Sequence, residues 1–200
     1  MTMGDEQNRA ERDALDIRVM RRIRDGDDAA VGELYDRYAP AALGLALRIV
    51  KDPHEAEDVV HDAFVAIVER AEQYKAERGS VAAWLVTTVR NLAVDRTRRR
   101  VRRTQITEEE LRHEPVPVVL DPEAIAWMER DRALVQKALS ALSASQRETL
   151  EIAFFEGLSY QEIAERLNVP LGTVKSRAAR ALSTLRALIE GEFEEPPEQP

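Results

Sequence analysis

The chain has 200 residues, 44% of them hydrophobic and 33% charged, and its formal net charge is −8 at pH 7. This composition predicts a globular protein with one large or two small domains, and it excludes an intrinsically disordered chain. No apolar run reaches the roughly 18 residues that a membrane helix needs, and the polar N-terminus lacks the apolar core of a signal peptide. The absence of cysteine excludes disulfides, thiolate zinc sites and a cysteine nucleophile, so we expect a cytoplasmic protein.

The charges are segregated along the chain. The stretch Arg90–Arg103 holds seven arginines and one acid, whereas Lys51–Glu72 holds seven acids and two basic residues. The final residues, 190–200, contain five glutamates and no basic residue. Basic surfaces on an acidic protein indicate contacts with DNA, and a separate acidic surface indicates a basic partner.

The first part of the chain predicts two helices. Residues 1–14 are polar, and we expect a flexible N-terminus there. A short helix follows, with apolar residues at helical spacing, and it ends at Gly26. Asp27 or Asp28 begins the next helix, which Pro40 breaks or kinks.

Two further helices differ sharply in charge. Asp52 followed by Pro53 predicts a helix start, since an aspartate cap and a proline in the first turn are both favoured there. This helix extends to about Glu72 and has an apolar face and an acidic face. After a loop, Ser80 caps a long helix that ends in six arginines among eight residues. That run exceeds what a helix terminus needs for its dipole, so it predicts electrostatic binding to phosphates.

A linker separates these helices from a second domain. Residues 104–120 contain acids, two prolines and no sustained apolar period, which predicts a flexible segment. Asp121 then caps a helix, and another begins at Ser143 or Ser145 and is stopped by Gly157. Because no β-alternation is present, we predict an all-α protein of two small helical domains joined by a flexible linker.

The stretch from Leu158 to Leu185 predicts a helix, a tight turn and a second helix. Ser159 caps the first helix, and Glu162 completes a capping box. Asn168 can adopt the left-handed conformation that ends a helix, and Pro170 forbids its continuation.

The second helix of this pair starts near Leu171 or Gly172 and has two faces. Its apolar positions are Val174, Ala178, Ala181, Leu182 and Leu185. The other face is polar and basic, and it suits a DNA major groove because such side chains bind phosphates and base edges. Its residues are Thr173, Lys175, Ser176, Arg177 and Arg180.

Two other classes of protein would each need features that the sequence lacks. An enzyme would rest on Asp58 and His61, whose spacing on a helix resembles half of a carboxylate metal site. A second such motif is missing from the sequence, as are a serine–histidine pairing and a phosphate-binding glycine loop. We therefore expect no catalytic residue, metal or cofactor. A regulator with a receiver domain and a terminal helix-turn-helix would need β-strands, which the sequence pattern does not predict.

Three blocks carry a family resemblance: DPHEAEDVVHDAFVAIVERAEQY, SVAAWLVTTVRNLAVDRTRRR and LSYQEIAERLNVPLGTVKSRAARAL. In this order and spacing they resemble a bacterial RNA polymerase sigma factor of the sigma-70 family, and more closely its extracytoplasmic-function (ECF) group. The resemblance implies sigma region 2 over residues 15–103 and sigma region 4 over residues 121–189. The acidic tail, 190–200, is outside the shared pattern, and His61 stands where the family commonly has glutamine.

The resemblance implies roles for individual residues. The acidic helix of region 2 docks on the clamp helices of the largest subunit of core RNA polymerase, through Asp52, Glu55, Asp58, Asp62 and Phe64. The following loop and helix open and recognise the minus-10 promoter element, through Tyr74, Trp84, Arg90, Asn91, Arg96, Arg98, Arg99 and Arg100, with Trp84 packed behind Arg90 and Asn91. Region 4 contacts the polymerase flap and recognises the minus-35 element through Thr173, Lys175, Ser176, Arg177 and Arg180. The family is commonly stress- or signal-responsive and is held inactive by an anti-sigma factor, which is a further expected partner.

Overall fold

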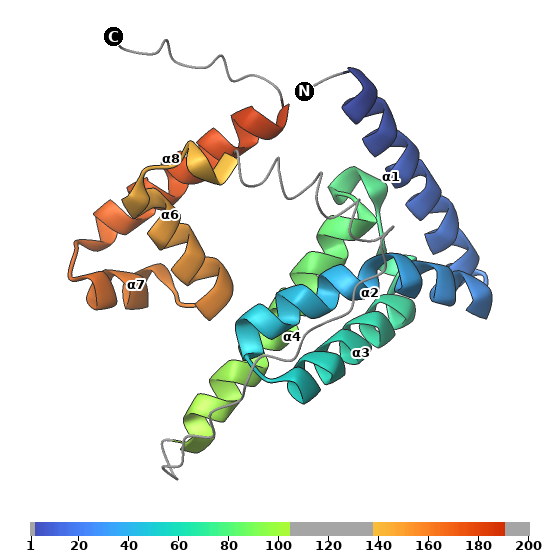
Figure 1. Ribbon diagram of the computed structural model, residues 1–200, viewed down its shortest axis with the longest axis horizontal. Coiled ribbons are helices and arrows are strands. Elements are labelled where there is room, and N and C mark those ends of the chain that lie inside the picture. Colours follow the sequence, from blue (N-terminus) through green and yellow to red (C-terminus); the bar gives the residue numbers. More distant parts are fainter. Residues whose placement is uncertain (1–2, 105–137, 191–200) are drawn as a thin grey trace. The chain divides into compact units, whose positions relative to one another are not determined.

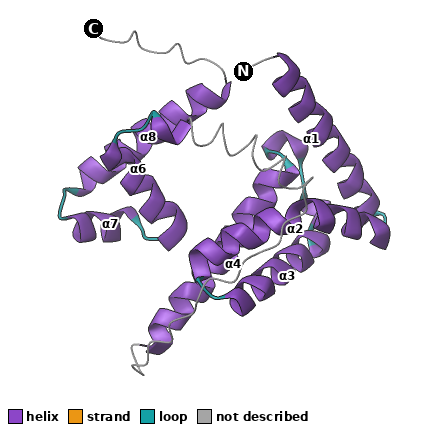
Figure 2. Ribbon diagram, viewed as in Figure 1, coloured by secondary structure: helices purple, strands orange, loops and turns teal. Residues whose placement is uncertain are grey.

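The computed structural model describes residues 3–104 and 138–190 (Figure 1). The chain divides into two compact units, Met1–Ile125 and Ala126–Pro200. Every regular element of the described residues is a helix (Figure 2), which confirms the predicted all-α fold. The predicted linker beyond Thr104, the helix predicted at Asp121 and the acidic tail after Glu190 lie outside the described residues.

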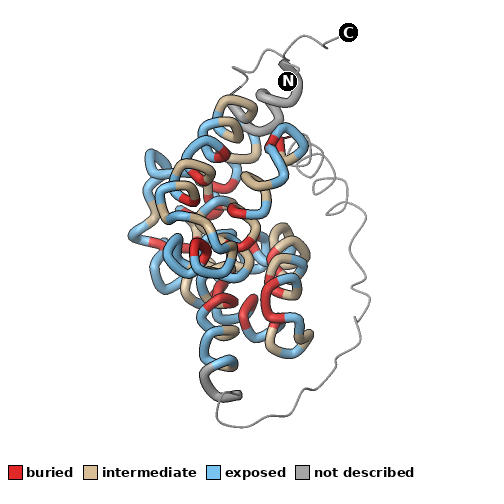
Figure 3. Tube along the Cα trace, turned by 90° about the vertical axis from the view of Figure 1, so that its left-hand side faces the viewer, coloured by how far each residue is buried: buried red, intermediate tan, exposed pale blue. Residues whose placement is uncertain are grey.

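The first unit is a helical bundle with α2 at its centre. Because α2 packs against α1, α3 and α4, it carries buried residues along most of its length. Buried positions follow the helix faces that meet in the interior (Figure 3), as the apolar periodicity predicts. The elements are α1 (Met3–Arg24), α2 (Asp28–Val50), α3 (Pro53–Glu69), α4 (Val81–Thr104) and the 3₁₀ turns η1 (Ala71–Gln73) and η2 (Ala76–Arg78).

The N-terminal helix is longer than the sequence predicts. Residues 3–14, expected to be a flexible N-terminus, are helical in α1. Apolar spacing misses this part, because residues 3–14 are mostly polar. Beside the buried apolar residues of α1, a charged residue also anchors this helix: Asp16 is only 1% exposed. Its carboxylate accepts hydrogen bonds from the Arg37 guanidinium and the Tyr38 hydroxyl, both on α2. Burial, and next the bond to Asp16, raise the pKa of Tyr38, so the phenol keeps the proton that it donates.

Helix α2 continues without a break through Pro40. A proline inside a helix costs about 3 kcal/mol, because it removes a backbone hydrogen bond and clashes with the preceding turn. Burial on both sides of the proline offsets this cost, with Leu34 before it and Ala46 and Ile49 after it. Of the two predicted outcomes at Pro40, a helix break is therefore excluded.

The predicted helix starts of α2 and α3 are confirmed by their hydrogen bonds. Asp27, rather than Asp28, caps α2 and accepts from the backbone N–H of Ala29 at 2.9 Å. Asp52 caps α3 and accepts from the backbone N–H of Glu55 at 2.9 Å, with proline in the first turn. These bonds satisfy donors that a helix terminus leaves without an intrahelical partner.

The described part of the second unit has a small core packed among short helical segments and one longer helix. Ser143, rather than Ser145, caps α6, and Gly157, with φ of 69°, ends the π-helical turn that follows it. The core consists of Ile152, Ile163, Ala164 and Val174. The elements are α6 (Ala144–Glu151), the π-helical turn η3 (Ile152–Glu156), α7 (Tyr160–Leu167) and α8 (Leu171–Glu190).

Replacing Asp16 by alanine should lower the free energy of unfolding by about 3 kcal/mol, because Arg37 and Tyr38 lose their buried acceptor. Urea denaturation followed by circular dichroism measures the change. Asp36→Ala removes an exposed carboxylate of α2 and is the control, with an expected change below about 0.5 kcal/mol. Equal effects of the two substitutions would contradict a structural role for the Asp16 cluster.

Candidate nucleic-acid interface

The helix-turn-helix of the second unit forms as the sequence predicts. The Ser159 hydroxyl accepts from the backbone N–H of Glu162 at 3.3 Å, and the Glu162 carboxylate accepts from the backbone N–H of Ser159 at 2.6 Å. This is the predicted capping box. Asn168 is left-handed, with φ of 51° and ψ of 48°, and ends α7. Helix α8 then begins at Leu171, the first of the two predicted starts.

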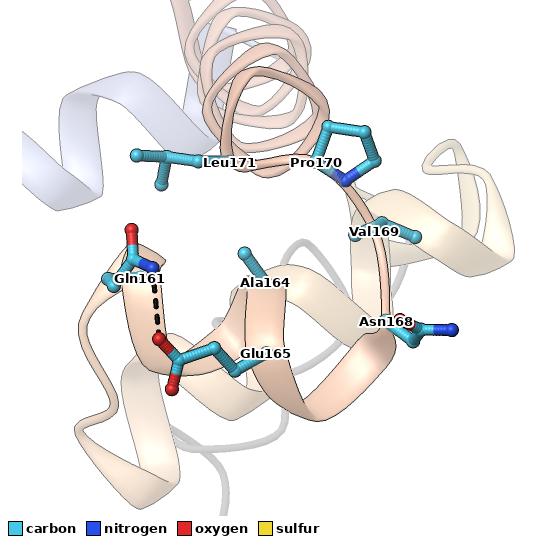
Figure 4. A pocket seen from close by; sticks show the side chains of 7 residues that line it. All are labelled: Gln161, Ala164, Glu165, Asn168, Val169, Pro170 and Leu171. Carbon is cyan, nitrogen blue, oxygen red and sulfur yellow. Dashed lines mark hydrogen bonds between the residues drawn. The ribbon is translucent and has the colours of Figure 1, made fainter.

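The turn borders an open hollow of about 360 Å³. Its lining comes from α7, from the turn and from the first residue of α8 (Figure 4). On its rim, Gln161 donates a hydrogen bond to the Glu165 carboxylate at 2.9 Å. The small side chain of Ala164 lies beneath the start of α8, so the two helices approach each other closely at this point.

One face of α8 is buried, and the side chains on that face are small. Val174, Ala178 and Ala181 are at most 1% exposed, as predicted. Leu182, predicted to share this face, is instead 53% exposed. The correction follows from helix geometry, because Leu182 is rotated about 100° around the helix axis from Ala181 and lies at the edge of the buried stripe.

The opposite face of α8 presents basic and hydroxyl side chains. Lys175 and Arg180 are exposed, and Arg177 is half-buried. Within the described residues none of these three forms an ion pair with an acid. The Ser176 hydroxyl, half-buried like that of Thr173, donates to the Thr173 carbonyl at 2.9 Å. The cations are therefore available to phosphates or base edges.

In the first unit, the loop before α4 contacts that helix through a pair of stacked aromatic rings. Tyr74 and Trp84 stack with ring centroids 5.6 Å apart and an interplanar angle of 20°. The Tyr74 hydroxyl donates to the Gly79 carbonyl at 3.1 Å. Burial, followed by the nearby carboxylates of Asp13, Asp16 and Glu77, raises the pKa of Tyr74, so the phenol remains a donor. The family resemblance implies a position for Trp84 behind Arg90 and Asn91, and the structure adds its stack on Tyr74.

The arginines of α4 from Arg90 to Arg100 fall into two groups. The Arg90 guanidinium donates to the Asn91 side-chain carbonyl at 3.0 Å, and Asn91 itself is exposed. Arg98 and Arg99 are also exposed, farther along the helix. Arg96 and Arg100 instead face α3. Sequence spacing could not reveal this division, because the acids that Arg96 and Arg100 meet belong to another helix.

The predicted polymerase-binding residues of α3 occupy different environments. The side chains of Asp58 and Asp62 are 63% and 58% exposed. Asp52 is committed to the cap of α3, and Glu55 is half-buried. Phe64 is only 4% exposed and packs at 4.8 Å, between ring centroids, against Tyr35. Phe64 is thus a core residue that fixes α3 and does not itself offer a contact surface.

Two structural features bear on the alternative classes of protein. Among residues 3–104 and 138–190, no cluster of three or more histidine and carboxylate side chains is arranged to hold a metal ion. Over the same residues, no helix combines the length and the apolar character that crossing a bilayer requires. The second unit contains a helix-turn-helix with a basic helix, and the first unit bears an acidic helix and a basic helix. Together these features indicate the class of DNA-binding transcription proteins.

The comparisons with known proteins assign the family. The sigma-70 region 2 family matches residues 34–103, and the sigma-70 region 4 family matches residues 132–185. The ECF RNA polymerase sigma factor SigK of Mycobacterium bovis is 33% identical over 177 residues, which cover 86% of this chain and 92% of SigK. The ECF sigma factor RpoE of Cereibacter sphaeroides is 31% identical, with 85% and 92% covered.

Solved structures give similar matches. Rhodobacter sphaeroides SigE, in complex with the anti-sigma ChrR, is 31% identical with a TM-score of 0.44, covering 86% of this chain and 96% of that chain. CnrH, in complex with the cytosolic domain of CnrY, is 24% identical with a TM-score of 0.42, covering 89% and 99%. On the sequence matches, the chain belongs to the ECF group of sigma-70 family RNA polymerase sigma factors. It accordingly binds core RNA polymerase and directs it to promoters.

Asn168→Val should destabilise the second unit by about 1–2 kcal/mol, because a branched side chain is strained at this positive φ. Asn168→Gly is the matched control and should be nearly neutral, since glycine adopts the left-handed conformation without steric cost. Thermal melting followed by circular dichroism measures both variants. If valine and glycine behave alike, the left-handed turn is not required for this helix pair.

Proposed function

We propose that the two units divide promoter recognition between them. Residues 15–103 would bind core polymerase and the minus-10 element, and residues 121–189 would bind the minus-35 element, with residues 104–120 as the connection. Two observations together carry this proposal. The carboxylates of Asp58 and Asp62 on α3 are exposed, and the basic side chains on one face of α8 form no ion pair within the described residues. A single chain with both surfaces can link a basic protein partner to DNA.

The docking surface for polymerase is centred on Asp58 and Asp62. Both carboxylates are well exposed, and they lie one helical turn apart on α3, so one basic partner helix can meet both. Glu55 extends this surface toward the start of the helix. Asp52 and Phe64 support it from within, as the cap and as a core side chain of α3.

The minus-10 surface is assigned to the Tyr74–Trp84 stack and to α4. A base removed from the duplex can lie against an aromatic ring, and such stacking offsets part of the cost of unstacking. Arg90, Asn91 and the exposed Arg98 and Arg99 would hold the nearby bases and backbone. The minus-35 surface is assigned to Thr173, Lys175, Ser176, Arg177 and Arg180 of α8.

Control by an anti-sigma factor follows from the family, since SigE is a 31% identical protein whose structure is a complex with the anti-sigma ChrR. We extend this to the chain as a proposal, together with a response to stress or another signal. Membership of this family also supports two further parts of the proposal. The chain would be located in the cytoplasm beside polymerase and DNA, and it would act by binding, without catalytic residues, metal or cofactor.

The docking surface is tested by Asp58→Lys with Asp62→Lys. The wild-type chain should co-purify with core polymerase and give promoter-specific transcripts from a promoter library, and the double variant should do neither. Circular dichroism should show that helicity is retained. Asp25→Lys with Asp36→Lys makes the same charge change at exposed positions away from α3 and should preserve both activities. Undiminished co-purification of the first variant would remove α3 from the docking role.

Arg177→Ala and Arg180→Ala test recognition of the minus-35 element. An arginine bidentate to guanine should cost about 1–3 kcal/mol when lost, and preference should relax at one base pair. Competition binding of the polymerase holoenzyme to single-base promoter variants measures this. Arg186→Ala, at an exposed position farther along α8, is the control and should leave base preference intact. A uniform loss over all sequences would instead identify a phosphate contact.

A further inference from the structure

Ion pairs join α3 to α4. Arg96 lies between two carboxylates that are one turn apart on α3, with one guanidinium nitrogen 2.6 Å from an Asp58 oxygen and the other 3.7 Å from an Asp62 oxygen. One turn along, an Arg100 nitrogen lies 3.7 Å from a Glu55 oxygen. That Glu55 oxygen is buried and accepts no hydrogen bond from the described residues, so the Arg100 charge compensates it.

These pairs connect two surfaces that have different proposed ligands. Asp58 and Asp62 are proposed to meet polymerase, and Arg96 and Arg100 are among the residues proposed to meet DNA. An arginine whose N–H groups face a carboxylate has fewer donors to offer a phosphate, and its charge is largely neutralised. In the free chain the α3 acids therefore compete with DNA for these arginines.

The exposure of the paired groups is unequal. The Asp58 and Asp62 side chains are 63% and 58% exposed, whereas the Arg96 side chain is 34% exposed. A protein partner can thus reach the carboxylates while they still hold the arginine. Exposed ion pairs contribute little to stability, so exchanging Arg96 for a basic group of a partner needs no unfolding of α3 or α4.

We propose that Asp58 and Asp62 mask Arg96 in the free chain, and that polymerase docking on these carboxylates releases Arg96 to bind a promoter phosphate. This proposal rests on the proposed function of the two surfaces. It couples polymerase docking to DNA binding, and such coupling is reciprocal. Removing the acids should therefore strengthen the binding of the free chain to DNA, and removing Arg96 should strengthen its binding to polymerase.

A double-mutant cycle on the free chain tests the masking. Asp58→Asn with Asp62→Asn should bind a labelled forked promoter DNA about 3–10-fold tighter, with a salt dependence steeper by about one phosphate contact. Fluorescence anisotropy at several salt concentrations measures both quantities. Asp36→Asn with Glu57→Asn, exposed acids without an ion pair among the described residues, makes the same charge change and should give a smaller gain.

The decisive comparison repeats the Asp58→Asn, Asp62→Asn substitution in an Arg96→Gln chain, where the specific gain should disappear. An equal gain in both backgrounds would show general charge repulsion and would overturn the proposal. On the polymerase side, Arg96→Gln should tighten binding to core enzyme about 2–5-fold, by the reciprocity of the coupling. Weaker binding would mean that Arg96 positions the carboxylates for docking, and would also overturn it.

These results are separable from the docking proposal itself. If Asp58→Lys with Asp62→Lys leaves co-purification intact, polymerase docks elsewhere and the proposed docking surface fails. The DNA-binding cycle still reports whether the acids mask Arg96, because it contains no polymerase.

Discussion

The packing of α3 and α4 against α2 is the constraint on which the first unit depends. Leu34 and Val50 of α2, with Val59 of α3 and Val89 of α4, are essentially inaccessible to solvent. Since these side chains fix the rotation of both outer helices, they also decide which charged residues face outward and which face each other. The acids of α3 and two arginines of α4 meet as a consequence of this core, which supplies far more stabilisation than exposed ion pairs do.

In the second unit, a smaller core fixes the rotation of the functional helix. A helix of eight residues, α7, supports one of twenty, α8, across a left-handed turn at Asn168. Ala164 of α7 and Val174 of α8 share one buried cluster, and Ala178 and Ala181 of α8 are also buried. The basic face of α8 therefore stays exposed as a consequence of how its apolar face is buried, and the charges themselves do little to hold the fold.

Charge organisation explains how a chain of net charge −8 can belong to a family that acts on DNA. Salt screens the acidic surface and the basic faces alike over about 8–10 Å at physiological ionic strength, so a basic face in contact with DNA is affected little by acids farther away. Such a protein is expected to bind DNA weakly by itself and to depend on its polymerase partner for a tight complex. The ion pairs between α3 and α4 strengthen that dependence, because they reduce the free positive charge of α4 until the acids have another partner.

The sequence by itself determined the all-α class, the caps at Asp52 and Ser159, the left-handed turn at Asn168 and the basic face of α8, since each depends on residues within a few positions of one another. Only the tertiary structure decided the burial of Asp16, the continuity of α2 through Pro40, the Tyr74–Trp84 stack and the pairing of Arg96 with Asp58. These features depend on contacts between separate elements, and periodicity within one helix shows which residues share a face without showing what that face meets.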